Sequence, residues 1–242
     1  MKILGLDSSG LVASVALVED DTLVAEYTTN YKKTHSQTLL PMLDEIRKML
    51  ELDLTTIDAI AVAAGPGSFT GLRIGSATAK GLGLALDRPI VPVPTVDALA
   101  YQLWGTDCYV CPMMDARRNQ VYTGIYRFAD DGLETVLPQC AIGIDEAINA
   151  VNEKDHKVIF TGDGVPVFTE YIQQNCCVPY VFAPAHRNRQ SAASVAVLGM
   201  QYYKEGRYVS AAEHAPEYLR VSQAERERME RENAERNSGT QN

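Results

Sequence analysis

Histidine, cysteine and long apolar runs are scarce in this chain of 242 residues, and each shortage excludes a class of function. The four histidines lack the H-x-x-x-H and H-E-x-x-H spacings with which one helix holds a metal, so we expect no metal site. The five cysteines are an odd number without a disulfide-framework spacing, which indicates a reduced, cytoplasmic protein. No run approaches the roughly 18 uncharged apolar residues of a membrane span, so we expect no membrane contact.

Basic residues are also fewer than acidic ones, which gives the chain a net charge of −9. Binding to nucleic acid relies on Lys and Arg beside the phosphates, so a large nucleic-acid surface of its own is not expected. A role in nucleic-acid chemistry would need a partner that supplies the positive surface. A serine peptidase is not expected either, since Ser68 has Pro66 and Thr70 at the two places where G-x-S-x-G requires glycine.

Short β-rich runs and amphipathic helices follow one another in the same order in both halves of the chain. The predicted strands are residues 2–9, 12–20, 22–27, 58–65, 89–94, 108–115, 120–128, 133–138 and 157–164, and the predicted helices are 34–52, 70–86, 95–104, 144–152, 166–174 and 191–206. Two successive β-β-β-α-β-α units favour mixed-sheet subdomains over a doubly wound parallel sheet. The predicted fold class is therefore α/β, the duplicated actin-like or ribonuclease-H-like (ASKHA) fold of sugar kinases, actin and Hsp70.

The composition predicts three segments along the chain. These are an N-terminal actin-like subdomain at 1–106, a C-terminal actin-like subdomain at 107–220, and a charged, flexible tail at 221–242. The tail holds five Glu and four Arg between Glu225 and Arg236. We predict a solvated helix with i, i+4 ion pairs there, and a contact with a partner is the alternative.

A glycine-rich turn, GPGSFTG, joins the strand at 58–65 to the helix at 70–86. It is no P-loop, because Leu72 follows the last of these glycines where that motif has Lys. It also breaks the dinucleotide fingerprint G-x-G-x-x-G, because Thr70 stands in place of the third glycine. The N–H groups at the start of the helix, from Ser68 to Thr70, could still bind an anion.

Small residues recur every four positions along that helix, at Gly71, Gly75, Ala79 and Gly83. Glycine inside a helix costs about 0.5–1 kcal/mol relative to alanine, so several of them need a reason. A stripe of small residues lets another helix approach closely. We interpret this stripe as room for a neighbouring helix, within the fold or in a partner.

Two aspartates end corresponding strands of the two halves. Asp7 begins the turn DSS, which matches in position the turn with which actin-like ATPases hold phosphate and metal, and Asp115 begins its counterpart DARR. Two carboxylates across a cleft could support metal-assisted phosphoryl transfer, whereas the simpler interpretation is two turn-forming residues. An actin-like ATPase or a sugar-kinase-type phosphotransferase is thus the alternative function. The candidate anion or nucleotide contacts are Asp7, Ser8, Ser68 and Thr70.

Six motifs occur in a fixed order along the chain: LGLDSS, HSQTLLPML, IDAIAVAAGPGSFTGLRIGSATAKGLGLAL, PIVPVPTVDALA, MMDARRNQVY and PEYLR. Together they resemble the bacterial TsaB (YeaZ) family. The resemblance covers residues 1–128 in order and is thin afterwards, with TGDG and PEYLR as the later anchors.

That resemblance implies the duplicated actin-like fold and a role in making N6-threonylcarbamoyladenosine at position 37 of tRNAs that read codons beginning with adenine. The family is similar to TsaD, which transfers the threonylcarbamoyl group and holds its metal with two histidines on the helix that corresponds to residues 95–100. This helix has no histidine here. The resemblance therefore implies a scaffold or activator without catalytic residues, metal or cofactor of its own.

The resemblance also implies partners. TsaD would form a heterodimer with this chain, TsaE would join the pair, and a homodimer would form in isolation. ATP or ADP would bind at the complex interface, and tRNA would be contacted only through the complex. In the family the first long helix and the glycine helix pack against the same helices of TsaD, which implies a helical interface on the subdomain at 1–106. The interface residues expected here are His35, Leu39, Leu43, Ile46, Phe69, Leu72, Arg73, Gly75, Ser76 and Ala79.

Overall fold

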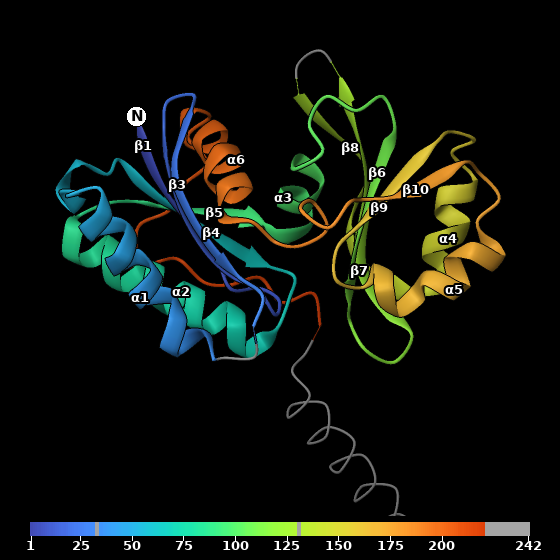
Figure 1. Cartoon of the computed structure of the whole chain (residues 1–242), viewed down its shortest axis with the longest axis horizontal. Coiled ribbons are helices and arrows are strands. Elements are labelled where there is room, and N and C mark those ends of the chain that lie inside the picture. The colour runs from blue at the N-terminus through green and yellow to red at the C-terminus, as the bar shows by residue number, and fades with distance from the viewer. Residues whose placement is uncertain (32–33, 130–131, 221–242) are drawn as a thin grey trace, which may run out of the picture.

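Two five-stranded mixed sheets form the two halves of the chain in the computed structural model, which describes residues 1–31, 34–129 and 132–220 (Figure 1). The predicted tail at 221–242 lies outside the described residues. No helix among those residues has both the length and the apolar character that crossing a membrane requires.

The first sheet has the strand order β3-β2-β1-β4-β5. Its strands are β1 (Lys2–Asp7), β2 (Ala13–Glu19), β3 (Thr22–Thr29), β4 (Ala59–Gly65) and β5 (Ile90–Pro94). β1, β2 and β3 pair antiparallel, whereas β4 lies parallel to β1 and β5. Every residue of β4 is buried, as expected for an apolar strand with both faces covered.

The second sheet repeats this order as β8-β7-β6-β9-β10. Its strands are β6 (Tyr109–Asp115), β7 (Gln120–Ala129), β8 (Gly132–Gly143), β9 (Val158–Thr161) and β10 (Tyr180–Phe182). The sequence analysis missed β10, because three residues are too few to show a period of two. The repeated topology confirms the predicted α/β, duplicated actin-like fold class.

The helices cover the sheets in layers (Figure 1). They are α1 (His35–Met49), α2 (Phe69–Leu86), α3 (Thr95–Tyr101), α4 (Ile144–Asn152), α5 (Val165–Asn175) and α6 (Ala192–Lys204), with a 3-10 turn at Leu54–Thr56. α1 and α2 lie side by side on one face of the first sheet, and α6 lies on its other face. α4 and α5 pack on the second sheet.

The C-terminal subdomain was predicted to span residues 107–220. The structure corrects this, because α6 lies within that range and packs on the first sheet. Val195, Ala196 and Leu198 of this helix pack in one apolar cluster with Ile3 and Val91 of the first sheet. α1 and α2 occupy the opposite face, so this face needs a cover that comes from later in the chain. The first structural half therefore consists of residues from both ends of the chain.

α3 lies between the two halves. Its residues Val96 and Leu99 share a buried cluster with Val110 of β6. The carboxylate of Asp97 in the same helix accepts hydrogen bonds from Tyr126 of β7 at 2.6 Å and from Tyr202 of α6 at 3.2 Å. These contacts fix the second sheet to the first half and set the width of the space between them.

Candidate functional site

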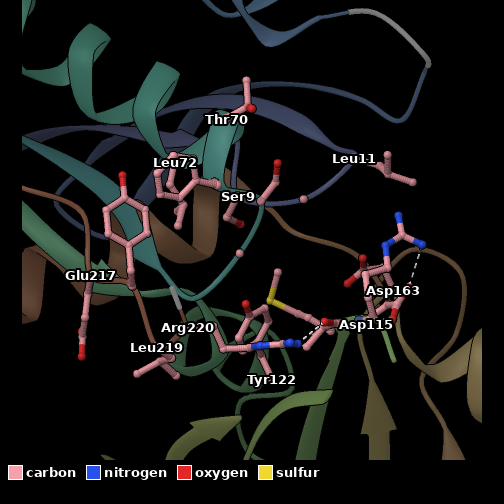
Figure 2. A pocket seen from close by; sticks show the side chains of 18 of the residues that line it. Ser9, Leu11, Thr70, Leu72, Asp115, Tyr122, Asp163, Glu217, Leu219 and Arg220 are labelled. Atoms are coloured by element: carbon pink, nitrogen blue, oxygen red, sulfur yellow. Dashed lines mark hydrogen bonds and ion pairs between the residues drawn. The ribbon is translucent and has the colours of Figure 1, made fainter. Parts of the chain in front are cut away.

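A cavity of about 480 Å³ lies between the two halves, at the carboxyl ends of β1, β4 and β6 (Figure 2). This is the edge at which open α/β sheets place their ligands. Its volume falls within the range of small-molecule sites. The lining consists of residues 9–11, 67–70 and 114–118, Leu72, Tyr122, Asp163 and residues 217–220.

Asp7 does not line this cavity. Its side chain accepts hydrogen bonds from the Ser9 backbone N–H at 2.9 Å and from Ser9 Oγ at 2.6 Å, and the residue is only 1% exposed. Burial raises the pKa of Asp7 to about 6, and the two bonds from Ser9 oppose that shift. One oxygen of the Asp7 carboxylate is thus used by its own turn, and the contact of Asp7 with an anion or nucleotide stays a prediction that its burial does not favour.

Ser8 is also withdrawn from the cavity. It is buried, and its hydroxyl donates to the carbonyl oxygen of Gly71 at 2.9 Å. This bond fixes the turn after β1 to the first turn of α2. The contact between Ser8 and an anion stays a prediction, which the burial and the engaged hydroxyl of Ser8 do not favour.

Ser68 and Thr70 do line the cavity, and both are exposed. Ser68 is the N-cap of α2, since its hydroxyl accepts a bond from the Gly71 N–H at 3.3 Å. The backbone N–H of Ser68 donates to the carbonyl oxygen of Ser9 at 2.7 Å, so this donor is already engaged. Contact of Ser68 and Thr70 with an anion stays a prediction that their placement allows.

In the second aspartate turn the aspartate itself lines the cavity, whereas in the first turn only Ser9 does. Asp115 accepts the backbone N–H of Arg117 at 2.7 Å and lies 3.0 Å from the Arg117 guanidinium. Arg117, Arg118 and Asn119 all have left-handed φ angles, of 65°, 56° and 57°. The two aspartate turns thus correspond in sequence and differ in exposure.

The segment after α6, residues 207–220, is the part of the site that the sequence analysis did not assign. It pairs with β5 through Ile90 and Val209, and Lys80 of α2 donates to the carbonyl oxygens of Ala212 and His214. Farther on, the Glu217 N–H donates to the carbonyl oxygen of Ala64 at 2.7 Å. The segment therefore runs along α2 to the cavity.

Its last residues connect the two halves. The Tyr218 ring lies 4.6 Å from that of Phe69, and the Arg73 guanidinium lies 4.0 Å over the Phe69 ring. The Arg220 guanidinium donates to the carbonyl oxygen of Ala116 in the second half. The motif PEYLR, residues 216–220, is the sequence feature that could have indicated this segment. No spacing rule, however, gives the motif a structural role.

The stripe of small residues on α2 faces the chain's own fold. A Cβ at Gly71 would lie 2.0 Å from the Ser8 carbonyl oxygen, and one at Gly75 would lie 2.6 Å from Ser8 Oγ. A Cβ at Gly83 would lie 2.9 Å from Cβ of Ala211 in the C-terminal segment. At its three glycines the stripe makes room for the β1 turn and for residues 207–220, which are not helices. Ala79 lies in the buried cluster that also contains Leu43 of the neighbouring helix α1.

Most of the interface residues expected from the resemblance lie inside the chain's own fold. Seven of the ten are buried: Leu39, Leu43, Ile46, Leu72, Gly75, Ser76 and Ala79. Of the remaining three, His35 and Phe69 are half-buried and Arg73 is exposed. His35 Nε2 lies 2.8 Å from the Gly10 carbonyl oxygen. Whether a partner binds α1 and α2 stays a prediction.

The outer faces of α1 and α2 carry exposed apolar side chains instead. Leu40 is 52% exposed and Met49 84% on α1, and Leu84 is 66% exposed on α2. A second, smaller cavity of about 300 Å³ lies between α1 and β3, with Tyr27 and Tyr31 in its wall. Any partner that binds these helices would meet this surface.

Cysteines and histidines do not gather into a site in the part of the chain that the structure describes. No group of three or more His, Cys, Asp or Glu residues there is arranged to hold a metal ion. Cys111 is buried, its thiol lies 3.4 Å from the Thr123 hydroxyl, and burial raises the pKa of this thiol to about 12. Such a thiol fills the core, as its place on a strand predicts.

Comparison with known proteins identifies the family. The family model of TsaD, tRNA N6-adenosine threonylcarbamoyltransferase, matches residues 22–228. The tRNA threonylcarbamoyladenosine biosynthesis protein TsaB of Bacillus subtilis is 34% identical over 225 residues, 93% of this chain and 96% of that protein. The chain belongs to the TsaB family. TsaB of Escherichia coli (strain K12) is 31% identical over 227 residues, 91% of this chain and 95% of that protein.

A TsaB-family structure also has this fold. The structure of YeaZ from Pseudomonas aeruginosa superposes with a TM-score of 0.73 at 26% identity, over 90% of this chain and 99% of that one. The resemblance drawn from six motifs is therefore confirmed, and it extends well past residue 128.

Proposed function

We propose that this TsaB-family chain is a non-catalytic subunit of the machinery that makes threonylcarbamoyladenosine in tRNA. The observation that carries the proposal is the match to proteins named TsaB over more than nine-tenths of both chains. In this proposal the chain acts beside TsaD and TsaE at adenosine 37 of tRNAs that read codons beginning with adenine. It contacts tRNA only through the complex, in keeping with its net charge of −9.

The state of Asp7 supports a role without catalysis. A carboxylate that holds a metal–phosphate group has to reach the cleft, whereas Asp7 is buried and accepts two hydrogen bonds from Ser9. The helix that corresponds to the metal-binding helix of TsaD instead uses Asp97 to join Tyr126 and Tyr202. In both places a polar side chain serves the fold.

The partner surface in this proposal is the outer face of α1 and α2. Leu40, Met49 and Leu84 expose apolar area there, and Arg73 supplies a charged group beside Phe69. Interfaces combine apolar anchors with Arg in this way. The same surface would serve a homodimer in the absence of TsaD, and ATP or ADP at the complex interface could meet Ser68 and Thr70.

Reconstitution tests the proposal. TsaD and TsaE from the same organism are given unmodified tRNA, threonylcarbamoyl-adenylate and ATP, with or without this chain, and the modified nucleoside is measured by mass spectrometry. We expect product only when the chain is present. Full product formation in its absence would remove the proposed role.

The alternative is an actin-like ATPase or sugar-kinase-type phosphotransferase that uses Asp7 and Asp115. Only Asp115 lines the cavity, so the pair does not meet across it. The alternative requires ATP turnover by the isolated chain with magnesium that is lost on Asp7→Asn. We expect no turnover with either the wild-type chain or the variant.

A further inference from the structure

Strand β3 forms one edge of the first sheet, and its outer side is open. It stands at the end of the order β3-β2-β1-β4-β5, and within the described residues it pairs with β2 alone. Six of its eight residues are exposed, among them the apolar Leu23 and Val24 and the aromatic Tyr27. The N–H and C=O groups along such an edge are a template for pairing with another extended chain.

The features that usually protect a free edge are scarce on this strand. Its sequence, TLVAEYTT, contains no Pro and no Lys. The one charged residue, Glu26, turns toward α6, where its Oε1 accepts from Ser191 Oγ at 2.7 Å and from the Ala193 N–H at 3.2 Å. A bulge at Val24 leaves the pairing of residues 25–29 regular. That stretch is therefore fit to pair with a further strand.

A cavity lies beside this stretch. It is the cavity of about 300 Å³ between α1 and β3, called here the α1–β3 cavity, and Tyr27, Thr29 and Tyr31 line it. Tyr27 and Thr29 are alternate residues, so they point to the same face of the sheet, and every second side chain of an added strand would point to that face too. The wall on the α1 side consists of Gln37, Thr38, Pro41, Met42 and Glu45. Open backbone groups and a place for an inserted side chain thus occur together, as in β-strand addition.

Glu45 gives the α1–β3 cavity a negative charge. It is the one charged side chain among the residues described there, and it is 59% exposed. Lys48 lies 3.8 Å from it, but the Lys48 ammonium is closer to Asp44, at 2.6 Å. With Tyr27 and Tyr31 in the same wall, this carboxylate suits a Lys or Arg side chain, which aromatic faces also attract. The net charge of −9 favours a basic partner as well.

We propose that β3 and the α1–β3 cavity bind an extended, basic segment of a partner protein, which adds a strand to the first sheet and places a Lys or Arg side chain beside Glu45. The open edge requires the extended conformation, and the cavity selects the charge of the inserted side chain. Leu40, Met49 and Leu84, which carry the partner surface of the proposed function, do not line this cavity. The site goes beyond the proposed function and does not depend on it.

Selection of short random peptides, displayed on phage, against the immobilised full chain tests the site. We expect enrichment of sequences in which Lys or Arg alternates with apolar residues. Enrichment of acidic sequences, or of apolar sequences without a cation, would overturn the proposal. Enrichment of sequences like that of β3 would overturn it in favour of a second copy of this chain. No enrichment over a surface without the chain would overturn it outright.

Variants of the chain locate the binding of an enriched peptide, measured by fluorescence anisotropy. Glu45→Gln should weaken binding about three- to tenfold, through loss of the charge. Tyr27→Thr, which keeps a residue favoured in strands, should weaken it about three- to thirtyfold, through loss of the ring. Glu153→Gln, exposed at the end of α4, makes the same charge change as Glu45→Gln and should leave the affinity within about twofold.

Two results would contradict the location. Wild-type affinity in both Glu45→Gln and Tyr27→Thr would remove the α1–β3 cavity from the site, and an equal loss in Glu153→Gln would show attraction by net charge alone. The thermal midpoint of each variant, measured without peptide, shows that each is folded.

N-methylated forms of the same peptide test the pairing of the backbones. Successive residues of a strand direct their N–H groups to opposite edges, so methylation of every second nitrogen removes the pairing in one of the two registers only. We expect one form to bind more than about tenfold more weakly than the other. Equal affinity of the two forms would show binding by side chains alone and would overturn the addition of a strand.

Discussion

At the scale of the residue, Asp7 shows how burial decides what a side chain can do. Its place at the end of β1, in the turn DSS, is what the sequence shows. Its burial depends on α2, whose first turn lies against Ser8 and Ser9. A carboxylate in such surroundings accepts hydrogen bonds within the turn, and its ionisation destabilises the folded state.

A pH dependence follows from that burial. The folded-state pKa of about 6 lies above the unfolded value of 3.8, so the folded state binds the proton more tightly. The stability that Asp7 contributes is then fully present below pH 3.8 and is lost as the pH rises through 6. Asp7→Asn should remove this loss and raise the free energy of unfolding at pH 7.5 by about 1–3 kcal/mol.

Urea denaturation at pH 4 and pH 7.5 measures this effect. We expect the variant to gain most over the wild type at the higher pH. A variant less stable than the wild type at pH 7.5 would mean that the charged form of Asp7 is favoured in the fold.

At the scale of the element, α2 shows why a stripe of small residues does not identify its own neighbour. The four-residue spacing correctly predicted one face that permits close approach. Only the structure shows that the approaching groups are the Ser8 carbonyl oxygen at Gly71 and Ala211 at Gly83. These contacts join residues far apart in the sequence, so no local pattern contains them.

Two glycine substitutions on α2 test this account. Gly71→Ala places a Cβ 2.0 Å from a backbone oxygen, and we expect a loss of about 2–4 kcal/mol in the free energy of unfolding. Gly81→Ala, in the same helix with nothing within 4 Å, should stabilise by about 0.5–1 kcal/mol. Equal effects of the two changes in urea denaturation would contradict the packing described for α2.

The sequence predicted the order of strands and helices because each has a period that its own residues display. The long α1 and α2 were predicted to within a few residues, whereas β10 has too few residues to be found. Of the four residues predicted to contact an anion or nucleotide, Ser68 and Thr70 line the cavity, and the contact itself stays a prediction. Burial of Asp7 and the path of residues 207–220 could not be predicted, since both arise from contacts between distant segments.

At the scale of the whole molecule, the two halves are joined by buried polar contacts as well as by apolar packing. Asp97 of α3 accepts from Tyr126 in the second sheet and from Tyr202 in α6. Burial raises the pKa of Asp97, and these two hydroxyls oppose the shift. With Arg220 and Ala116 at the cavity, this cluster fixes one half relative to the other.

Tyr126→Phe tests this connection. It removes the 2.6 Å bond and leaves the buried carboxylate one donor short, so we expect a loss of about 1–3 kcal/mol in the free energy of unfolding. Tyr203→Phe on α6 is the matched control, since its ring stacks on Tyr208, and should change stability by less than about 0.5 kcal/mol. If Tyr126→Phe left the free energy of unfolding unchanged in the same denaturation series, the role of this bond would be contradicted.

The modification rate in the reconstituted reaction, measured with Asp7→Asn and with Leu84→Glu, tests most directly whether this chain acts through its surface. Asp7→Asn should keep the rate within about twofold, because a buried carboxylate takes no part in the chemistry. Leu84→Glu, which puts a charge on the exposed apolar face of α2, should lower the rate more than about tenfold. Loss of the rate in Asp7→Asn, with Leu84→Glu unchanged, would contradict this role and favour catalysis in the cleft.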